Sequence, residues 1–188
     1  MLGFLFKSRA SSLAPANEDP GPSEMMLLRQ AMDEDFTDVV DLAHQMGLTI
    51  RRPAFCSEIA GSLTHCDGKW SIGVNDQHSA NRQRFTIAHE IAHYLMHRDL
   101  ILKHGPMAGV YDSCKYRQPL VALLNPHIEI KHERQASIMA AKTLMSEPKL
   151  RRMIDAGMSI FQIADRIGCS VGATKIRFGM LNLPLHGR

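Results

Sequence analysis

A helix-forming run over residues 82–98 carries the pentad His-Glu-Ile-Ala-His at residues 89–93. The run contains no glycine or proline, and Ser79 or Asn81 is a suitable N-cap. On a helix, two histidines four residues apart lie on the same face, so both imidazoles can bind one small cation. The intervening Glu90 is better placed to accept a proton from water at the metal than to be a main ligand. The pentad therefore predicts a metal site with a general base.

The other residues of this run indicate a helix that is buried in a folded core. At about 100° per residue, apolar side chains fill about half of the helix circumference, and only Arg84 interrupts them. These apolar residues are Phe85, Ile87, Ala88, Ile91, Ala92, Leu95 and Met96. A narrow polar stripe beside them contains Thr86, His89, His93 and His97. Because the rest of the circumference is apolar, we expect this stripe to face a cavity; the alternative is a solvent-facing row of histidines.

A third metal ligand is expected from a second helix over residues 127–145, which Asn-Pro at residues 125–126 introduces. Glu133 falls on the apolar stripe of that helix, together with Ser137, Ala140 and Leu144. A carboxylate at such a position is costly unless a cation or hydrogen-bond donors compensate its charge. Two histidines, one carboxylate and an open position for water form the ligand set of a catalytic zinc site. Glu129 and His97 are the alternative third ligands.

The same segments resemble a known family, the ImmA/IrrE zinc metallopeptidases. Residues 82–97 closely resemble the signature helix of that family, and residues 133–145 resemble its second motif, which supplies the third metal ligand. Residues 72–75 resemble the strand that precedes the metal helix, and residues 167–177 resemble the closing pair of short helices. Together the resemblance covers most of residues 30–183.

Three positions depart from the family pattern. Ser137 stands where the family has asparagine, Met139 where it has phenylalanine, and Ala92 where glycine is usual inside the pentad. These changes leave the expected ligands intact. Of the three, Ser137 is the one that can change how a metal ligand is oriented.

The resemblance implies an α+β fold, a mainly helical zincin-like domain of the gluzincin type with a small antiparallel sheet packed on the metal helix. It implies zinc bound by His89, His93 and Glu133, with Glu90 as the general base. Members of the family act on helix-turn-helix transcriptional repressors, often encoded beside the peptidase, and so derepress mobile-element or stress genes. The chain resembles the compact form of the family, without a C-terminal sensor domain.

Residues 59–75 predict a β-hairpin around a two-residue turn at Asp67 and Gly68. The turn sets the register, which pairs His65 with Trp70, Leu63 with Ile72, and Gly61 with Val74. In zincin-like folds an edge strand above the metal helix can hold an extended peptide by strand addition. We assign this role to the strand that contains Ile72 and Val74; the alternative is a sheet that only covers the core.

A long connection between the two motif helices, residues 99–124, predicts a lid or a substrate-selecting loop near the site. A side chain from this region could donate a hydrogen bond to the oxyanion that forms during peptide hydrolysis. The candidates are Tyr111, Tyr116 and His104, followed by His127 and His132 just after the loop.

Composition divides the chain into a tail and one domain. Residues 8–24 are rich in serine, alanine, proline and glycine, so residues 1–24 are predicted to be a disordered tail. Residues 25–188 are enough for a single hydrophobic core. At the start of this domain, residues 26–46 predict one amphipathic helix, whose inward side chains are Phe36, Val39, Val40 and Ala43.

Charge and cysteine usage indicate a cytoplasmic protein that binds neither nucleic acid nor membrane directly. The net charge of +3 is too small to indicate nucleic-acid binding, and no apolar run approaches the about 20 residues that span a bilayer. The densest basic cluster is expected to be a solvated helix face and consists of Lys149, Arg151 and Arg152. The cysteines lack metal-site spacing and are expected to be reduced thiols: Cys56, Cys66, Cys114 and Cys169.

Three classes of function follow from these observations. The first is a zinc-dependent endopeptidase that cleaves a helix-turn-helix repressor. The second is a zinc-containing partner that sequesters or remodels such a repressor without cutting it. The third is a DNA-binding regulator, because residues 160–170 resemble the first half of a helix-turn-helix motif. The helix that follows them offers only Lys175 and Arg177 for contacts with DNA, which favours the first two classes.

Overall fold

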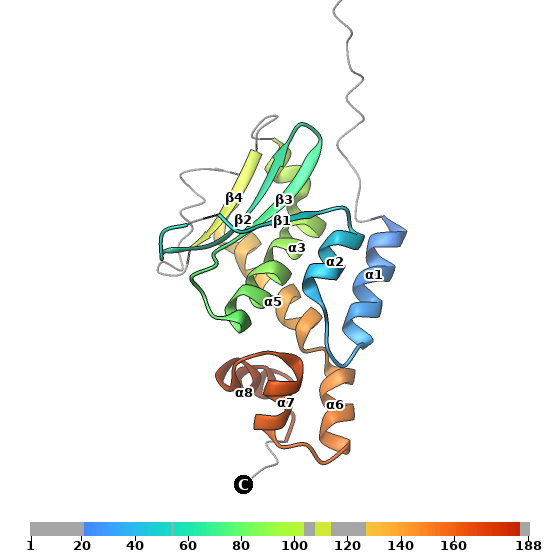
Figure 1. Ribbon diagram of the computed structural model, residues 1–188. Coiled ribbons are helices and arrows are strands. Elements are labelled where there is room, and N and C mark those ends of the chain that lie inside the picture. The colour runs from blue at the N-terminus through green and yellow to red at the C-terminus, as the bar shows by residue number, and fades with distance from the viewer. Residues whose placement is uncertain (1–20, 54, 104–107, 114–126, 185–188) are drawn as a thin grey trace, which may run out of the picture.

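A computed structural model describes residues 21–53, 55–103, 108–113 and 127–184. The fold is α+β and mainly helical, as predicted, with a sheet that lies against α3 (Figure 1). Along the chain, the elements are α1 (Pro22–Asp33), α2 (Val39–Gln45), β1 (Thr49–Arg51), β2 (Ile59–Cys66), β3 (Lys69–Val74), α3 (Ala80–Leu102), β4 (Ala108–Ser113), α5 (Ile130–Leu144), α6 (Glu147–Asp155), α7 (Ile160–Ile167) and α8 (Val171–Met180). None of the described helices combines the length and apolarity needed to cross a membrane.

The hairpin formed by β2 and β3 has the predicted register, including the pairs Leu63–Ile72 and Gly61–Val74. At its turn, Asp67 has φ +51° and Gly68 has φ +74°, as a two-residue hairpin turn requires. The sheet order is β1-β3-β2-β4, so this hairpin occupies the centre of the sheet.

The sheet is mixed, which corrects the prediction of an antiparallel sheet. β4 pairs with β2 antiparallel, whereas β1 pairs with β3 in parallel. Since β4 occupies the outer edge of β2, the remaining edge of the hairpin is that of β3, and β1 pairs there. β1 has only three residues, which is too short for an alternation of polar and apolar side chains to predict a strand from the sequence.

The helix that carries the pentad, α3, is buried along most of the apolar arc that its sequence predicts, although Met96 at the end of this arc is 36% exposed. Ser79 is its N-cap, and its buried apolar residues include Ile87, Ile91 and Leu95. α3 contacts β2, β3 and β4 and also packs against α5, so the sheet and α5 together enclose it (Figure 1). α3 extends to Leu102 and β4 covers residues 108–113, so part of the connection predicted over residues 99–124 is regular structure.

The predicted single helix over residues 26–46 is wrong, because the chain forms α1 and α2 with a break between them. The acidic residues 33–35 disfavour a longer α1, since negative charge is unfavourable at a helix C-terminus. Asp38 then begins α2 as its N-cap and accepts hydrogen bonds of 3.0 Å from the backbone N–H groups of Val40 and Asp41. α1 begins at Pro22, so the last residues of the predicted tail are helical.

Arg84, which interrupts the apolar arc of α3, connects this helix to two other parts of the fold. Its guanidinium donates to the carbonyl oxygens of Thr37 at 2.9 Å and Ile167 at 3.2 Å. It also lies over the ring of Phe36, with its central carbon 4.0 Å from the ring centroid. Phe36 was predicted to face inward but is 47% exposed. Its ring covers Arg84 at the edge of the core.

The C-terminal helices α7 and α8 pack against each other, and α8 is hydrogen-bonded to the end of α5. Gly168 ends α7 in the left-handed conformation at φ +65°, and Ser170 then caps α8. Arg177 is buried, and its Nε donates to the carbonyl oxygen of Met145 at 3.0 Å. One of the two basic side chains that a DNA-binding helix would have offered therefore has an internal role.

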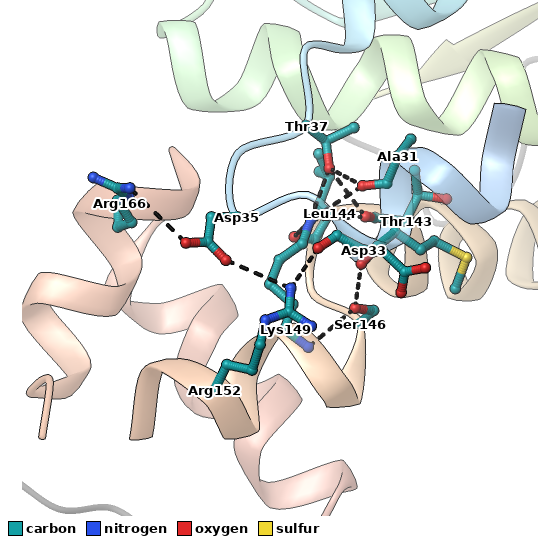
Figure 2. A network of polar contacts seen from close by, with 11 residues as sticks. Ala31, Asp33, Asp35, Thr37, Thr143, Leu144, Ser146, Lys149, Arg152 and Arg166 are labelled. Atoms are coloured by element: carbon teal, nitrogen blue, oxygen red, sulfur yellow. Dashed lines mark hydrogen bonds and ion pairs between the residues drawn. The ribbon is translucent and has the colours of Figure 1, made fainter. Parts of the chain in front are cut away.

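Lys149 is fully buried, which corrects the prediction of a solvated basic face at this position. Its Nζ donates to Thr37 Oγ1 at 2.8 Å and to carbonyl oxygens at the ends of α1 and α5: Leu144 at 3.3 Å, Ala31 at 3.4 Å and Thr143 at 3.5 Å (Figure 2). Carbonyl groups at helix C-termini lack intrahelical partners and carry partial negative charge. The ammonium group satisfies them and joins α6 to α1 and α5.

We predict that Lys149 makes the stability of the fold depend on pH. Burial lowers the pKa of Lys149 to about 8 from 10.5, so folding favours its uncharged form. The stability of the wild type should then rise by about 2 kcal/mol between pH 7.5 and 10, relative to a Lys149→Met variant. Urea unfolding of both proteins across this range measures the difference, and parallel pH profiles would contradict the prediction.

Candidate metal centre

His89, His93 and Glu133 meet between α3 and α5. The Nε2 atoms of the two histidines are 3.1 Å apart. Glu133 Oε2 lies 3.1 Å from Nε2 of His89, and Oε1 lies 3.3 Å from Nε2 of His93. Both histidines are buried, and the Glu133 side chain is 19% exposed. The structure thus brings together the three residues that the sequence analysis selected from two separate helices.

The spacing of these atoms fits a bound metal ion. Zinc binds histidine nitrogen and carboxylate oxygen at about 2.0–2.2 Å, so neighbouring ligands of a tetrahedral ion lie about 3.3 Å apart. The two Nε2 atoms are 3.1 Å apart, and each lies 3.1 or 3.3 Å from a different oxygen of the Glu133 carboxylate, which is close to this value. Burial raises the pKa of the Glu133 carboxyl, but its contacts with His89 and His93 outweigh burial and lower the pKa below its usual range. Glu133 therefore supplies a negative charge to the group.

Helix geometry explains how two helices deliver these side chains. His89 and His93 are four residues apart on α3, so one face of the helix presents both. Small buried residues on both helices permit a close approach: Ala88 and Ala92 on α3, Ala136 and Ala140 on α5. The Ser137 hydroxyl lies on the same face of α5 as Glu133. It is 3.3 Å from Nδ1 of His89, and this contact orients the ring so that Nε2 points toward Glu133.

Glu90 is fully buried beneath β2, at the point where this strand has a glycine. A Cβ atom added at Gly61 would lie 2.3 Å from Cγ2 of Thr86, 2.9 Å from the carbonyl oxygen of Gly73 and 3.2 Å from Oε1 of Glu90. Only glycine fits there without displacing its neighbours. Gly61 therefore sets how closely the sheet approaches the carboxylate of Glu90. The sequence predicts Gly61 as a residue of the hairpin, but its contact with Glu90 depends on how the sheet packs on α3.

The two alternative third ligands have other partners. His97 Nδ1 lies 3.1 Å from Nδ1 of His93, and its Nε2 lies 3.1 Å from Oε1 of Gln135. Burial, followed by the neighbouring His93, lowers the pKa of His97 to about 4, so His97 is neutral at pH 7. Glu129 is 59% exposed and pairs with Lys131 at 3.0 Å. The geometry therefore favours Glu133 over both as the third ligand.

Beside His97, a cavity of about 470 Å³ opens between α3 and α5. Its lining combines apolar and polar side chains: Met96, His97, Leu100, His132, Gln135, Ile138, Met139 and Lys142. His97 and Gln135 thus border both the histidine group and this cavity.

The prediction that Ile72 and Val74 contact a substrate is wrong. Both side chains are fully buried, because β3 lies inside the sheet between β1 and β2. The outer strands of the described sheet are β1 and β4. Tyr111 belongs to β4, where its backbone pairs with Ser62.

Of the other candidates for an oxyanion donor, the structure describes His127 and His132. Tyr116 and His104 lie outside the described residues. His127 is exposed just before α5. Nδ1 of His132 accepts a hydrogen bond of 2.9 Å from the backbone N–H of Glu129, so this histidine caps α5. That contact gives His132 a structural role at the N-terminus of the helix.

Comparison with known proteins assigns the chain to a family. No curated protein matched the sequence. The model of the Peptidase_M78 family, described as an IrrE N-terminal-like domain, matches residues 43–178. This range contains the whole β2–β3 hairpin, the metal helix with Glu90, and the helix that carries Glu133. The match covers more than half of the chain, and the chain therefore belongs to the Peptidase_M78 family of IrrE N-terminal-like domains.

Proposed function

We propose that the protein is a zinc-dependent endopeptidase. The observation that carries this proposal is the meeting of His89, His93 and Glu133 with the spacing of a tetrahedral metal site. Two imidazoles and one carboxylate are the protein ligands of catalytic zinc in several peptidases, where a fourth position remains for water. Membership in a peptidase family supports the same assignment.

The side chains of this chain have separate roles in the proposed reaction. When bound, zinc supplies Lewis acidity, which activates a water molecule and polarises the carbonyl group of the peptide bond. Glu90 accepts the proton that the water loses as its oxygen attacks the carbonyl carbon. As the C–N bond breaks, Glu90 returns this proton to the nitrogen of the leaving amine. Its burial beneath Gly61 holds the carboxylate in one place for both transfers.

An extended substrate can add to the sheet at β4. Within the described part of the sheet, β4 is an outer strand that pairs only with β2, and it also contacts α3. An outer strand presents backbone N–H and C=O groups with which a peptide can pair. This assignment replaces β3, whose two edges are both occupied.

The proposed substrate is a helix-turn-helix transcriptional repressor encoded near this protein, and the proposed location is the cytoplasm. The support for this substrate is the resemblance of residues 82–97 and 133–145 to the ImmA/IrrE peptidases. Cleavage of such a repressor would derepress mobile-element or stress genes. The described cysteines Cys56, Cys66 and Cys169 are free thiols, which agrees with a reducing compartment.

Incubation of the zinc-loaded protein with the purified repressor tests the proposal. A time course on a gel should show fragments of the repressor that accumulate with wild-type protein and not with a Glu90→Gln variant. Complex formation without fragments would instead support sequestration or remodelling of the repressor and would overturn the proposed peptidase activity.

A further inference from the structure

A row of three side chains leads from the metal centre to the surface of the protein. It begins at His93, whose Nδ1 lies 3.1 Å from Nδ1 of His97. It continues from Nε2 of His97 to Oε1 of Gln135, again at 3.1 Å. His93 and His97 are buried, whereas Gln135 is an exposed residue of α5 at the wall of the cavity beside His97.

The positions of the hydrogen atoms in this row depend on one another. A histidine that binds a metal through Nε2 carries its hydrogen on Nδ1. His93 then donates from Nδ1, and Nδ1 of His97 must accept. A neutral His97 that accepts at Nδ1 carries its own hydrogen on Nε2, which donates to Oε1 of Gln135. In the orientation that the Gln135 amide has here, Oε1 faces Nε2 of His97, and because this oxygen can only accept, the contact agrees with this arrangement.

The opposite arrangement would oppose metal binding. If His97 carried its hydrogen on Nδ1, it would donate to Nδ1 of His93 and place the hydrogen of His93 on Nε2. That hydrogen would point toward Oε1 of Glu133, which lies 3.3 Å away, and no lone pair would remain on Nε2 for a metal. Gln135 does not contact His93, but its acceptor oxygen favours one of the two arrangements through His97.

We propose that His97 and Gln135 are positioning residues that hold His93 in the tautomer that binds the metal and thereby raise the affinity of the site for zinc. The proposal rests on the proposed function for the identity of the metal. It assigns a second task to α5, which supplies the third ligand, Glu133, and also the residues that contact His89 and His97, Ser137 and Gln135. Ser137 contacts His89 directly, and Gln135 acts on His93 through His97.

Zinc affinity measured by competition with a chromogenic chelator tests the proposal on the full-length protein. His97→Leu removes the acceptor, and its affinity should fall by about 10- to 100-fold. His97→Asn keeps an acceptor oxygen near the position of Nδ1 and should recover most of this loss. Gln135→Leu should weaken binding by about fivefold, the effect of one hydrogen bond, whereas Gln135→Glu keeps an acceptor and should retain affinity.

A control variant and a spectrum separate positioning from packing. Lys142→Gln changes another side chain of the same cavity that is not part of the row, and its zinc affinity should equal that of the wild type. The visible absorption of the cobalt-substituted protein should change in His97→Leu and return toward the wild-type spectrum in His97→Asn. Circular dichroism of the metal-free variants verifies that each one folds.

The outcomes distinguish this inference from the proposed function. Equal zinc affinity in the wild type and folded His97→Leu would overturn the positioning role alone. An equal loss in His97→Leu and His97→Asn would also overturn it, because packing rather than hydrogen bonding would then explain the effect. A wild-type protein that binds no zinc would overturn the proposed function and, with it, this inference.

Discussion

Replacement of Glu90 by glutamine should slow cleavage of the repressor by about 10²- to 10⁴-fold, the usual contribution of a general base. Glutamine has nearly the size of glutamate, so it fits the same buried space beneath Gly61. It cannot accept a proton from water at neutral pH. The side chain is not among the three proposed metal ligands, so the zinc content of the variant should equal that of the wild type.

Two measurements on the same preparation check this prediction. The initial rate of fragment formation on a gel reports catalysis, and atomic absorption reports bound zinc. A variant that cuts as fast as the wild type would show that Glu90 is not the general base. A variant that has also lost its zinc would show that Glu90 contributes to metal binding, contrary to the ligand set proposed above.

Replacement of Glu133 by alanine should weaken zinc binding by more than about 100-fold, since the loss of a direct ligand exceeds the cost of losing an outer hydrogen-bond partner. The change leaves two neutral imidazoles and removes the only carboxylate of the described triad. Titration with zinc in the presence of a competing chelator measures the effect. Cleavage should fall in parallel with zinc occupancy.

Glu129→Ala provides a matched control on the same segment of the chain. Glu129 lies one turn before Glu133, but its side chain is exposed and pairs with Lys131. Zinc affinity in this variant should equal that of the wild type. Unchanged affinity and stoichiometry in Glu133→Ala would instead show that the third ligand lies elsewhere.

The elements that could be predicted from the sequence depend on contacts between near neighbours. The turn at Asp67 and Gly68 sets the register of the whole β2–β3 hairpin, because a two-residue turn leaves one way to pair the flanking strands. The four-residue spacing of His89 and His93 likewise determines that both face the same way on α3. Glu133 was accessible to the same reasoning, because a carboxylate in an apolar stripe requires compensation.

The errors concern residues whose surroundings come from distant parts of the chain. The residues next to Lys149 in the sequence predict a surface lysine. In the structure, carbonyl oxygens at the ends of α1 and α5 surround its ammonium group and accept its hydrogen bonds. The sequence of the strand with Ile72 and Val74 is compatible with an edge position, but β1 pairs with it in the structure, so it lies inside the sheet. In both cases the environment of the residue depends on a segment that is distant in the sequence, and the spacing of nearby residues does not predict where that segment lies.

Local spacing therefore determined which face of α3 carries His89 and His93, the register of the hairpin and the chemistry of the candidate ligands, because helix and turn geometry repeat over a few residues. Only the tertiary structure decided that Glu133 reaches the two histidines, that His97 contacts His93 and Gln135, and that Gly61 lies against Glu90. These relations depend on how α5 and the sheet pack on α3. Packing depends on the shapes of whole elements, which no short motif contains.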